Sequence, residues 1–166
     1  MSIRFEKLCD KHQTEIMKIF NYHIANGTSA FPQTEIPEEF YKKVICVSDT
    51  CSGYAIIEQE ESRVVGFCMI KPYHLLSTFS HTMDFTIFLD PKYTGNGIGK
   101  RSLELIEHDA KEIGVKHLVS LISSENEGSC RFHKKNGFYY CGELKNIGHK
   151  HGRDFGIIMM EKDLGC

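Results

Sequence analysis

The chain has 166 residues and a formal net charge of −2 at pH 7, and its acidic and basic residues are interspersed. It shows no basic stripe typical of nucleic-acid binders, no apolar run near the roughly 20 residues of a membrane span, and no hydrophobic signal segment. We therefore expect one cytoplasmic domain, residues 1–166, with no nucleic-acid or membrane partner.

The first strand and helix are predicted from local periodicity. Ile3 and Phe5 alternate with polar neighbours, which predicts a strand. Asp10 is the expected N-cap of a helix that Gly27 ends. The apolar face of that helix repeats at helical spacing through Ile16, Ile19, Phe20 and Ile24.

A second helix and a hairpin follow the break between Pro32 and Pro37. The helix is expected to begin near Pro37, with Glu38 and Glu39 at its positive N-terminal end. Two β-rich runs then form the predicted hairpin about Glu60-Glu61-Ser62: Tyr54 to Glu58 and Val64 to Ile70.

The second half of the chain continues this alternation. The expected order is strand, helix, strand, helix and a final antiparallel pair: Phe79 to Leu89, the next helix to Gly114, Leu118 to Ile122, Glu125 to Asn136, then Phe138 to Ile147 with Phe155 to Met160. This order predicts a mixed sheet that is antiparallel at both ends and contains one parallel crossover.

The most informative segment is the glycine-rich run from Tyr93 to Arg101. Gly95, Gly97 and Gly99 stand at every second position between an expected strand and an expected helix. Glycine leaves backbone N–H groups unobstructed, and the first N–H groups of a helix lack intrahelical partners. Strand, loop and helix N-terminus together predict a phosphate cradle, with Lys100 and Arg101 at its rim.

Two common nucleotide motifs do not fit this spacing. A P-loop needs a glycine where Thr94 stands and Ser or Thr where Arg101 stands. A dinucleotide fingerprint counted from Gly95 places Lys100 at its third glycine. A glycine-rich turn without a ligand remains the alternative.

The cysteines and histidines do not indicate a metal site. The seven cysteines are scattered, at positions 9, 46, 51, 68, 130, 141 and 166, and we interpret them as reduced thiols. The nine histidines lack a second, matching set of ligands at metal-site spacing. We expect no metal cofactor.

Two segments carry a family resemblance. The block from Asp84 to Arg101 resembles the acetyl-CoA-binding motif of the GNAT superfamily of N-acetyltransferases, and Asn126 to Phe138 resembles the helix that follows it and its closing Gly-Phe. Within the superfamily the chain is most similar, nearly end to end, to the phosphinothricin and methionine sulfoximine N-acetyltransferase group. That similarity includes Ile19 to Tyr22, Thr28 to Phe31 and Gly148 to Arg153.

The resemblance implies a fold and a co-substrate. The fold is an α/β, mixed-sheet GNAT fold: a mostly antiparallel sheet with one splayed parallel pair, flanked by about four helices. A bulge in the strand before the glycine loop is implied to cause the splay. Acetyl-CoA is the implied co-substrate, held by Ile87, Phe88, Leu89, Thr94, Gly95, Asn96, Gly97, Ile98, Gly99, Lys100, Arg101, Asn126 and Ser129. Thr94 departs from the family's usual Arg or Gln.

The resemblance also assigns the chemistry. Asp84 stands where the similar group has Glu and is the candidate general base, since an amine nucleophile must lose a proton. A backbone N–H of the same strand is the implied oxyanion donor. His133 occupies the place of a family Tyr that protonates the leaving thiolate; a helix-surface histidine without a proton role is the alternative.

The acceptor side departs most from the similar group. Relatives carry arginines where this chain has His74, Leu75 and Leu76, and an Asp where it has Gly156. The candidate acceptor-binding residues are Tyr22, Phe31, Tyr73, His74, Lys150 and Arg153. We expect a small amine that is less acidic or bulkier than the group's usual acceptors.

Three functions are open at this point. The first is N-acetylation of a small amino-acid-like amine, the second is N-acetylation of peptides or proteins, and the third is CoA binding without catalysis. A homodimer is implied by the resemblance alone.

Overall fold

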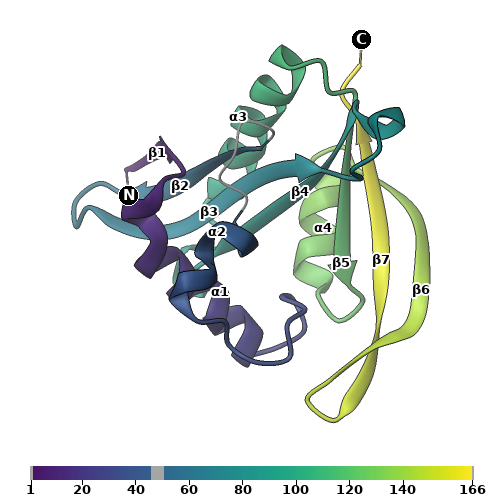
Figure 1. Ribbon diagram of the computed structural model, residues 1–166, viewed down its shortest axis with the longest axis horizontal. Helices are drawn as coiled ribbons and strands as arrows, with labels where there is room; N and C mark the ends of the chain where they lie inside the picture. The colour runs from purple at the N-terminus through teal and green to yellow at the C-terminus, as the bar shows by residue number, and fades with distance from the viewer. Residues whose placement is uncertain (1, 46–50, 166) are drawn as a thin grey trace.

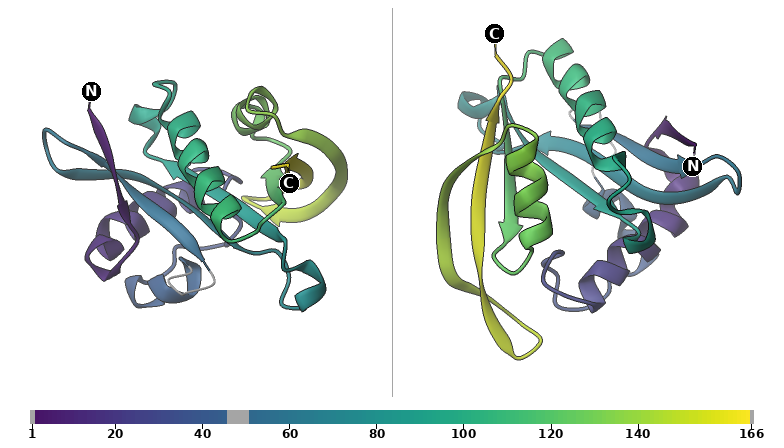
Figure 2. Two further views of the ribbon diagram at one scale, coloured as in Figure 1. Left: turned by 90° about the horizontal axis from the view of Figure 1, so that it is seen from above. Right: turned by 180° about the vertical axis from the view of Figure 1, so that it is seen from behind.

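The computed structural model describes residues 2–45 and 51–165. Within these residues seven strands form one sheet in the order β1-β2-β3-β4-β5-β7-β6, and four α-helices cover it (Figure 1). Helices α1 and α2 lie on one face of the sheet and α3 and α4 on the other (Figure 2). The β4–β5 pair is parallel and the other pairs are antiparallel, so the predicted mixed GNAT-type sheet is confirmed.

The elements agree with the predicted order and differ at their ends. The strands are β1 Ile3–Lys7, β2 Ser52–Glu58, β3 Arg63–Pro72, β4 Thr82–Leu89, β5 His117–Ser123, β6 Tyr139–Lys150 and β7 Arg153–Asp163. The α-helices are α1 Gln13–Ala25, α2 Tyr41–Val44, α3 Ile98–Glu112 and α4 Glu127–Lys135. Short 3-10 turns span Asp10–His12, Glu38–Phe40, Ser77–Phe79 and Pro91–Tyr93.

Two expected boundaries are wrong. Asp10 does not cap the first helix: it begins a 3-10 turn whose N-cap is Cys9, and His12 precedes α1. Phe79 ends another 3-10 turn, so β4 begins at Thr82. In both places a short turn intervenes that apolar periodicity alone does not distinguish from the neighbouring element.

Helical spacing of apolar residues places the two long helices. Ile16, Phe20 and Ile24 of α1 are buried against β3 and β4, as their four-residue spacing predicts. On the other face, Leu103 and Ile106 of α3 pack against the same sheet. The sheet therefore has a separate apolar core on each side, and the residues of β4 alternate between them.

The β4–β5 ladder is short, and this determines the position of the site. Pairing starts at Thr82 with His117 and ends at Asp84 with Val119, although β4 continues to Leu89 and β5 to Ser123. The two strands meet at their starts and separate toward their ends (Figure 1). The expected bulge is not found, because the β3–β4 register runs without a shift from Gly66–Leu89 to Pro72–Met83. The separation occurs on the β5 side alone.

The described cysteines correct one expectation. Cys51 is disulfide-bonded, so its interpretation as a reduced thiol is wrong. Cys9, Cys68, Cys130 and Cys141 are free thiols. Cys46 and Cys166 lie outside the described residues.

Two searches of the described residues concern membranes and metals. None of their helices has the length and apolar character needed to cross a membrane. Nor do three or more His, Cys, Asp or Glu side chains in this part of the chain gather as metal ligands would.

Gly66 lies where the backbones of β3 and β4 leave no room for a side chain. A Cβ there would lie 2.5 Å from Leu89 Cδ2 and 2.6 Å from the Phe88 carbonyl oxygen. We expect Gly66→Ala to lower the free energy of unfolding by about 1–3 kcal/mol, measured by urea denaturation. The control is Gly142→Ala in β6, whose Cβ would meet its nearest neighbour at 3.7 Å. Equal effects of the two substitutions would contradict this account of the β3–β4 contact.

Candidate active site

The backbone of β4 has one edge that β3 does not use. The Asp90 N–H donates to Val65 O at 2.8 Å, and the Tyr73 N–H donates to Thr82 O at 3.2 Å. In an antiparallel ladder every second residue pairs, so Thr86 and Phe88 also direct their backbone groups to β3. The backbone groups of Phe85, Ile87 and Leu89 face the opposite edge, where β5 has separated from β4.

This alternation narrows the sequence prediction. Ile87 offers its N–H and C=O groups to the space between the strands, and the backbone of Phe88 belongs to the β3 ladder. Leu89 offers its N–H group, since its carbonyl oxygen already accepts from His23 Nε2 at 2.8 Å. The side chain of Phe88 packs on the α1 face, with its ring centroid 5.2 Å from that of Phe20. An extended molecule with amide groups can therefore pair with β4 through Ile87 and Leu89.

The glycine loop continues directly from that edge. Gly95 and Gly97 have φ values of 78° and 76°, which favour glycine, and nothing lies within 4 Å of the position where either would carry a Cβ. Gly97 is the N-cap of α3, so the open space lies at the N-terminus of a 15-residue helix. This geometry suits an anion.

Gly99 has a different role from its two neighbours. A Cβ at Gly99 would lie 2.9 Å from Cε2 of Phe132 in α4. Absence of a side chain there allows α3 and α4 to approach each other. Of the remaining loop positions, Ile98 is buried in the core and Asn96 donates to Thr94 O at 3.3 Å.

Lys100 and Arg101, at the rim of the glycine loop, differ in how firmly contacts within the protein hold them. Arg101 donates to Ile3 O at 3.2 Å and its guanidinium lies 5.6 Å from the centroid of the Phe5 ring, so it is held toward β1. Lys100 is exposed and faces Glu104 at 3.7 Å. The hydroxyl of Thr94 donates to Pro91 O at 2.9 Å. Lys100 is thus the more available cation for a bound phosphate.

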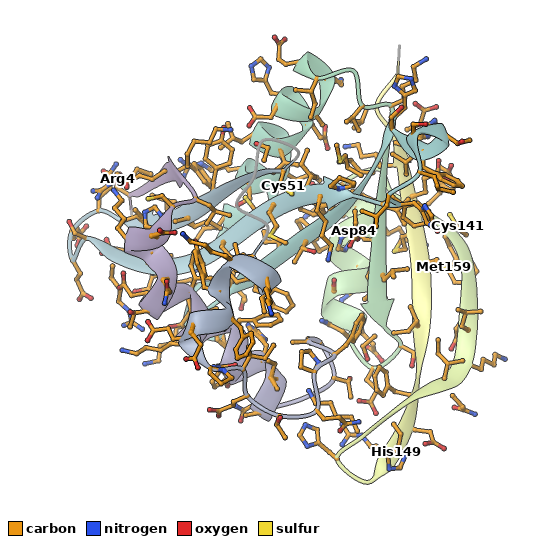
Figure 3. The ribbon with its side chains drawn as sticks, viewed as in Figure 1. Arg4, Cys51, Asp84, Cys141, His149 and Met159 are labelled. Atoms are coloured by element: carbon orange, nitrogen blue, oxygen red, sulfur yellow. The ribbon has the colours of Figure 1, made fainter. Side chains whose placement is uncertain are left out.

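Asp84 lies where β4 and β5 last pair (Figure 3). Its carboxylate is 3.6 Å from Lys71 Nζ on the paired position of β3. Burial raises the pKa of Asp84 above its usual value, and the Lys71 charge opposes that rise. A carboxylate with a raised pKa beside a strand opening is well suited to accept a proton.

His133 is buried inside the molecule and not on the helix surface. Its side chain is 3% exposed and packs between aromatic rings, with Phe138 at 4.8 Å and Phe85 at 5.9 Å between centroids. Nδ1 lies 2.8 Å from the Ser129 carbonyl oxygen, so Nδ1 carries the hydrogen and donates. Among the described residues, the buried Nε2 atom has no hydrogen-bond partner.

Burial lowers the pKa of His133 to about 4, and the bond to the Ser129 carbonyl only partly opposes that effect. The imidazole is therefore neutral at pH 7, with an unprotonated Nε2. This state does not suit the acid role that the sequence left open, because the group has no spare proton near neutral pH.

The N-terminus of α4 is tied to the loop after α1. Asn126 is the N-cap: its side-chain oxygen accepts from the Ser129 N–H at 3.0 Å, and its amide donates to Ser29 Oγ at 2.9 Å. Ser129 Oγ lies 3.3 Å from His133 Nδ1. The side chain of Asn126 is thus committed to structure.

Two candidate acceptor-binding cations have partners inside the protein. Arg153 donates twice to Glu125, at 2.8 and 2.9 Å, and Thr28 Oγ1 donates to the same carboxylate at 2.8 Å. Lys150 is 1% exposed and its Nζ donates to Ala30 O at 2.8 Å, and burial lowers its pKa. Both cations attach the loop after α1 to the β6–β7 hairpin.

A hollow of about 360 Å³ lies between that loop and the sheet. Apolar side chains provide most of its lining: Phe31, Leu121, Ile147, Phe155 and Ile157. Gln33, Gly148 and His149 complete it, and His149 lies at the end of the β6–β7 hairpin (Figure 3). Leu121 is on the same face of β5 as Val119, which pairs with Asp84, so the hollow begins roughly 7 Å along the strand from the candidate base.

The remaining candidates are placed elsewhere around the opening. Tyr22 is 48% exposed on α1. Tyr73 and His74 lie after β3, where both contact Phe79, at 6.1 and 5.2 Å between centroids. Of the six candidate acceptor residues, Phe31 lines the hollow. Lys150 and Arg153 do not line it, and they bind Ala30 O and Glu125 instead.

Sequence reasoning missed several residues of this region. Leu121 and Ile157 were taken as ordinary strand residues, and Glu125 only as the start of a helix. A signal was present for Leu121, because successive side chains of a strand point to opposite faces. Leu121 therefore lies on the face opposite to that of Ser120 and Ile122, on a strand next to the candidate base. Glu125 offered none, because its two partners are far from it in the sequence.

The site joins an open strand edge, a glycine loop whose geometry suits an anion and a partly buried carboxylate, which is an arrangement that suits an acyltransferase with a phosphate-bearing acyl carrier. The Acetyltransferase (GNAT) family model matches residues 16–138. The chain therefore belongs to the GNAT acetyltransferase family and is an acetyl-CoA-dependent N-acetyltransferase.

Individual relatives are similar over most of the chain. The L-amino acid N-acyltransferase MnaT of Escherichia coli (strain K12) is 27% identical over 99% of this chain and 94% of its own. The phosphinothricin N-acetyltransferase of Alcaligenes faecalis is 22% identical over 91% of this chain and 77% of its own. The structure of a phosphinothricin acetyltransferase from Sinorhizobium meliloti with AcCoA has a TM-score of 0.92 and 22% identity, covering 99% of this chain and 90% of that one.

Burial of neutral His133 predicts a pH-dependent stability. Its pKa is about 4 in the folded state against about 6.5 in an unfolded chain, so the unfolded state binds more protons as pH falls between these values. The contribution of neutral His133 to the free energy of unfolding is fully present above pH 6.5 and is lost toward pH 4. We expect it to fall by about 2 kcal/mol between pH 7 and pH 5.

The measurement is urea denaturation of the wild type and His133→Leu at both pH values. The variant should lose about 2 kcal/mol less than the wild type on acidification. His108→Gln, which replaces an exposed histidine of α3, should behave as the wild type. An identical pH response of wild type and His133→Leu would contradict the assignment.

Proposed function

We propose that this enzyme acetylates the amine of a small, amino-acid-like acceptor. The observation that carries the proposal is the free edge of β4, which runs from Asp84 to the glycine loop and has the apolar hollow on its acceptor side. The names of the relatives support the acceptor class, since they include L-amino acids, phosphinothricin and methionine sulfoximine.

The residues present fit acetyl-CoA. Thr94 to Gly99, with Lys100 at the rim, would hold the pyrophosphate, and Ile87 and Leu89 would pair with the pantetheine amides. Ser129 would contact the arm from α4, and Asn126 would act through its cap on that helix. When bound, acetyl-CoA supplies an activated thioester.

Asp84 is the proposed general base. Its raised pKa brings it nearer to that of the ammonium group it must deprotonate, and its separation from the hollow leaves room for a bridging water. The Lys71 charge opposes that rise in pKa and so favours the ionised carboxylate. A backbone N–H on the free edge of β4 is the proposed oxyanion donor, a kind of contact that elsewhere contributes roughly 3–4 kcal/mol.

His133 is proposed as a neutral, buried side chain in the last turn of α4, and not as the acid that protonates the thiolate. Its Nδ1 hydrogen is committed to Ser129 O, and its Nε2 is unprotonated at neutral pH. The proton that the leaving thiolate needs therefore comes from another source, such as solvent or the proton removed from the amine.

The acceptor is proposed to carry an uncharged, largely apolar side chain. The hollow is lined mostly by apolar residues, and the nearby cations Lys150 and Arg153 already have internal partners. Placing an unpaired anionic group in such a hollow costs free energy. Phe31, which stacks on Phe155 at 6.2 Å, would contact the acceptor directly.

The domain organisation, the compartment and the oligomeric state of the enzyme are proposed as well. We propose that residues 1–166 act as one domain, in the cytoplasm and as a homodimer. Exposed apolar side chains on the edge strand β6 support a dimer surface: Tyr139, Tyr140, Leu144 and Ile147. Light scattering at micromolar concentration distinguishes a dimer from a monomer.

Asp84→Asn should lower kcat/KM by roughly 10²- to 10⁴-fold, because the amine loses its base. CoA affinity, measured by calorimetry, should stay within twofold of the wild type. Lys71→Gln removes the opposing charge, so the acidic limb of its pH–rate profile should move to higher pH. Asp10→Asn, an exposed carboxylate paired with Lys42, is the control and should be unchanged. Full activity of Asp84→Asn would disprove the assignment.

Acceptor preference is tested by CoA release with a panel of amines and short peptides. Methionine sulfone or phenylalanine should exceed phosphinothricin in kcat/KM by about tenfold or more, because the hollow offers no free cation to the phosphinate. Ile147→Arg, a substitution at a side chain 59% exposed on the lining, should narrow that difference. A wild-type preference for phosphinothricin, or for peptides, would overturn the proposed acceptor.

A further inference from the structure

A histidine of α1 reaches the free edge of β4. His23 Nε2 lies 2.8 Å from the carbonyl oxygen of Leu89, the last residue of the strand. A carbonyl only accepts, so Nε2 carries the hydrogen and donates. Leu89 belongs to the alternate set whose backbone groups face away from β3. The imidazole therefore lies on the edge that β5 has left unpaired.

The ring is held there by more than one contact. Its centroid is 5.1 Å from that of Phe88, and the ring of Tyr22 meets it edge to face at 5.5 Å. His23 is half-buried, so the ring is neither a freely moving surface group nor part of the closed core. Contacts on two sides and a hydrogen bond fix its position at Leu89.

Distance along β4 indicates which part of a bound cofactor the ring would meet. Leu89 is four residues beyond Phe85, which is about 13 Å in an extended strand. Phe85 is next to Asp84, where the chemistry is proposed, and the glycine loop begins just beyond Leu89. The ring thus lies beside the part of that path nearest the glycine loop, where the pantetheine arm approaches the pyrophosphate.

We propose that His23 is a further cofactor-binding residue, which contacts the pantetheine arm and closes the free edge of β4 at the Leu89 carbonyl. With that carbonyl taken by the imidazole, the edge offers the N–H and C=O of Ile87 and the N–H of Leu89 to the arm. The inference rests on the proposed placement of the arm along β4. It adds to the glycine loop a contact from α1, the helix on the acceptor side of the sheet.

The test compares two ligands that differ by the arm. CoA and adenosine 3′-phosphate 5′-diphosphate share the nucleotide, its 3′-phosphate and the pyrophosphate, but only CoA carries pantetheine. By calorimetry, His23→Ala should weaken CoA binding by about five- to tenfold and leave binding of the 3′-phosphate 5′-diphosphate nucleotide unchanged, as expected for loss of about 1 kcal/mol of contact. His23→Gln, which keeps an N–H donor for Leu89 O, should recover most of the CoA affinity.

Lys18→Ala, an exposed site on the same helix, is the matched control and should bind both ligands as the wild type. In histidine-labelled protein the His23 ring signals should shift with CoA and not with the nucleotide that lacks pantetheine. Unchanged CoA affinity in His23→Ala, or an equal loss for both ligands, would overturn the inference. If wild-type protein bound CoA no more tightly than the nucleotide that lacks pantetheine, the placement of the arm along β4 would itself be wrong.

Discussion

The early end of the β4–β5 ladder is the constraint on which the rest of this site depends. Backbone N–H and C=O groups inside a protein need partners, and a strand that loses its neighbour after Asp84 leaves both groups of Ile87 and the N–H of Leu89 for another molecule. The β3 ladder continues without a shift on the other side, so β4 keeps its register. A rigid, half-paired strand can hold an extended cofactor as an additional strand would.

Several contacts on the acceptor side keep this opening in shape. Glu125 binds Arg153 and Thr28 together, and Lys150 holds the carbonyl of Ala30, so the loop after α1 is fixed to the β6–β7 hairpin. These charges stabilise the walls of the hollow and are no longer available to an acceptor. Lys150 and Arg153 therefore add positive charge to this region without lining the hollow, and the lining itself is mostly apolar.

Local sequence signals predicted most elements because each depends on neighbouring residues. The four-residue spacing of Ile16, Phe20 and Ile24 is sufficient to identify a helix and its buried face. Gly95 and Gly97 likewise identify a loop with positive φ before a helix. Boundaries next to 3-10 turns were predicted wrongly, at Asp10 and Phe79, because such turns share residue types with the elements they precede.

Long-range contacts were beyond the reach of these signals. The sequence left His133 either as a candidate acid or as a helix-surface histidine, and only its packing between Phe85 and Phe138 makes it neutral and buried. Arg153 resembled a free cation until the fold placed Glu125 beside it.

By itself the sequence determined the order of elements, the glycine loop and the family resemblance, since all three are properties of consecutive residues. The tertiary structure alone decided which edge of β4 is free, which cations have internal partners and in which direction the pKa of Asp84 and of His133 departs from its usual value. The reason is physical: desolvation and charge pairing depend on groups brought together by folding, often more than 20 residues apart in the chain.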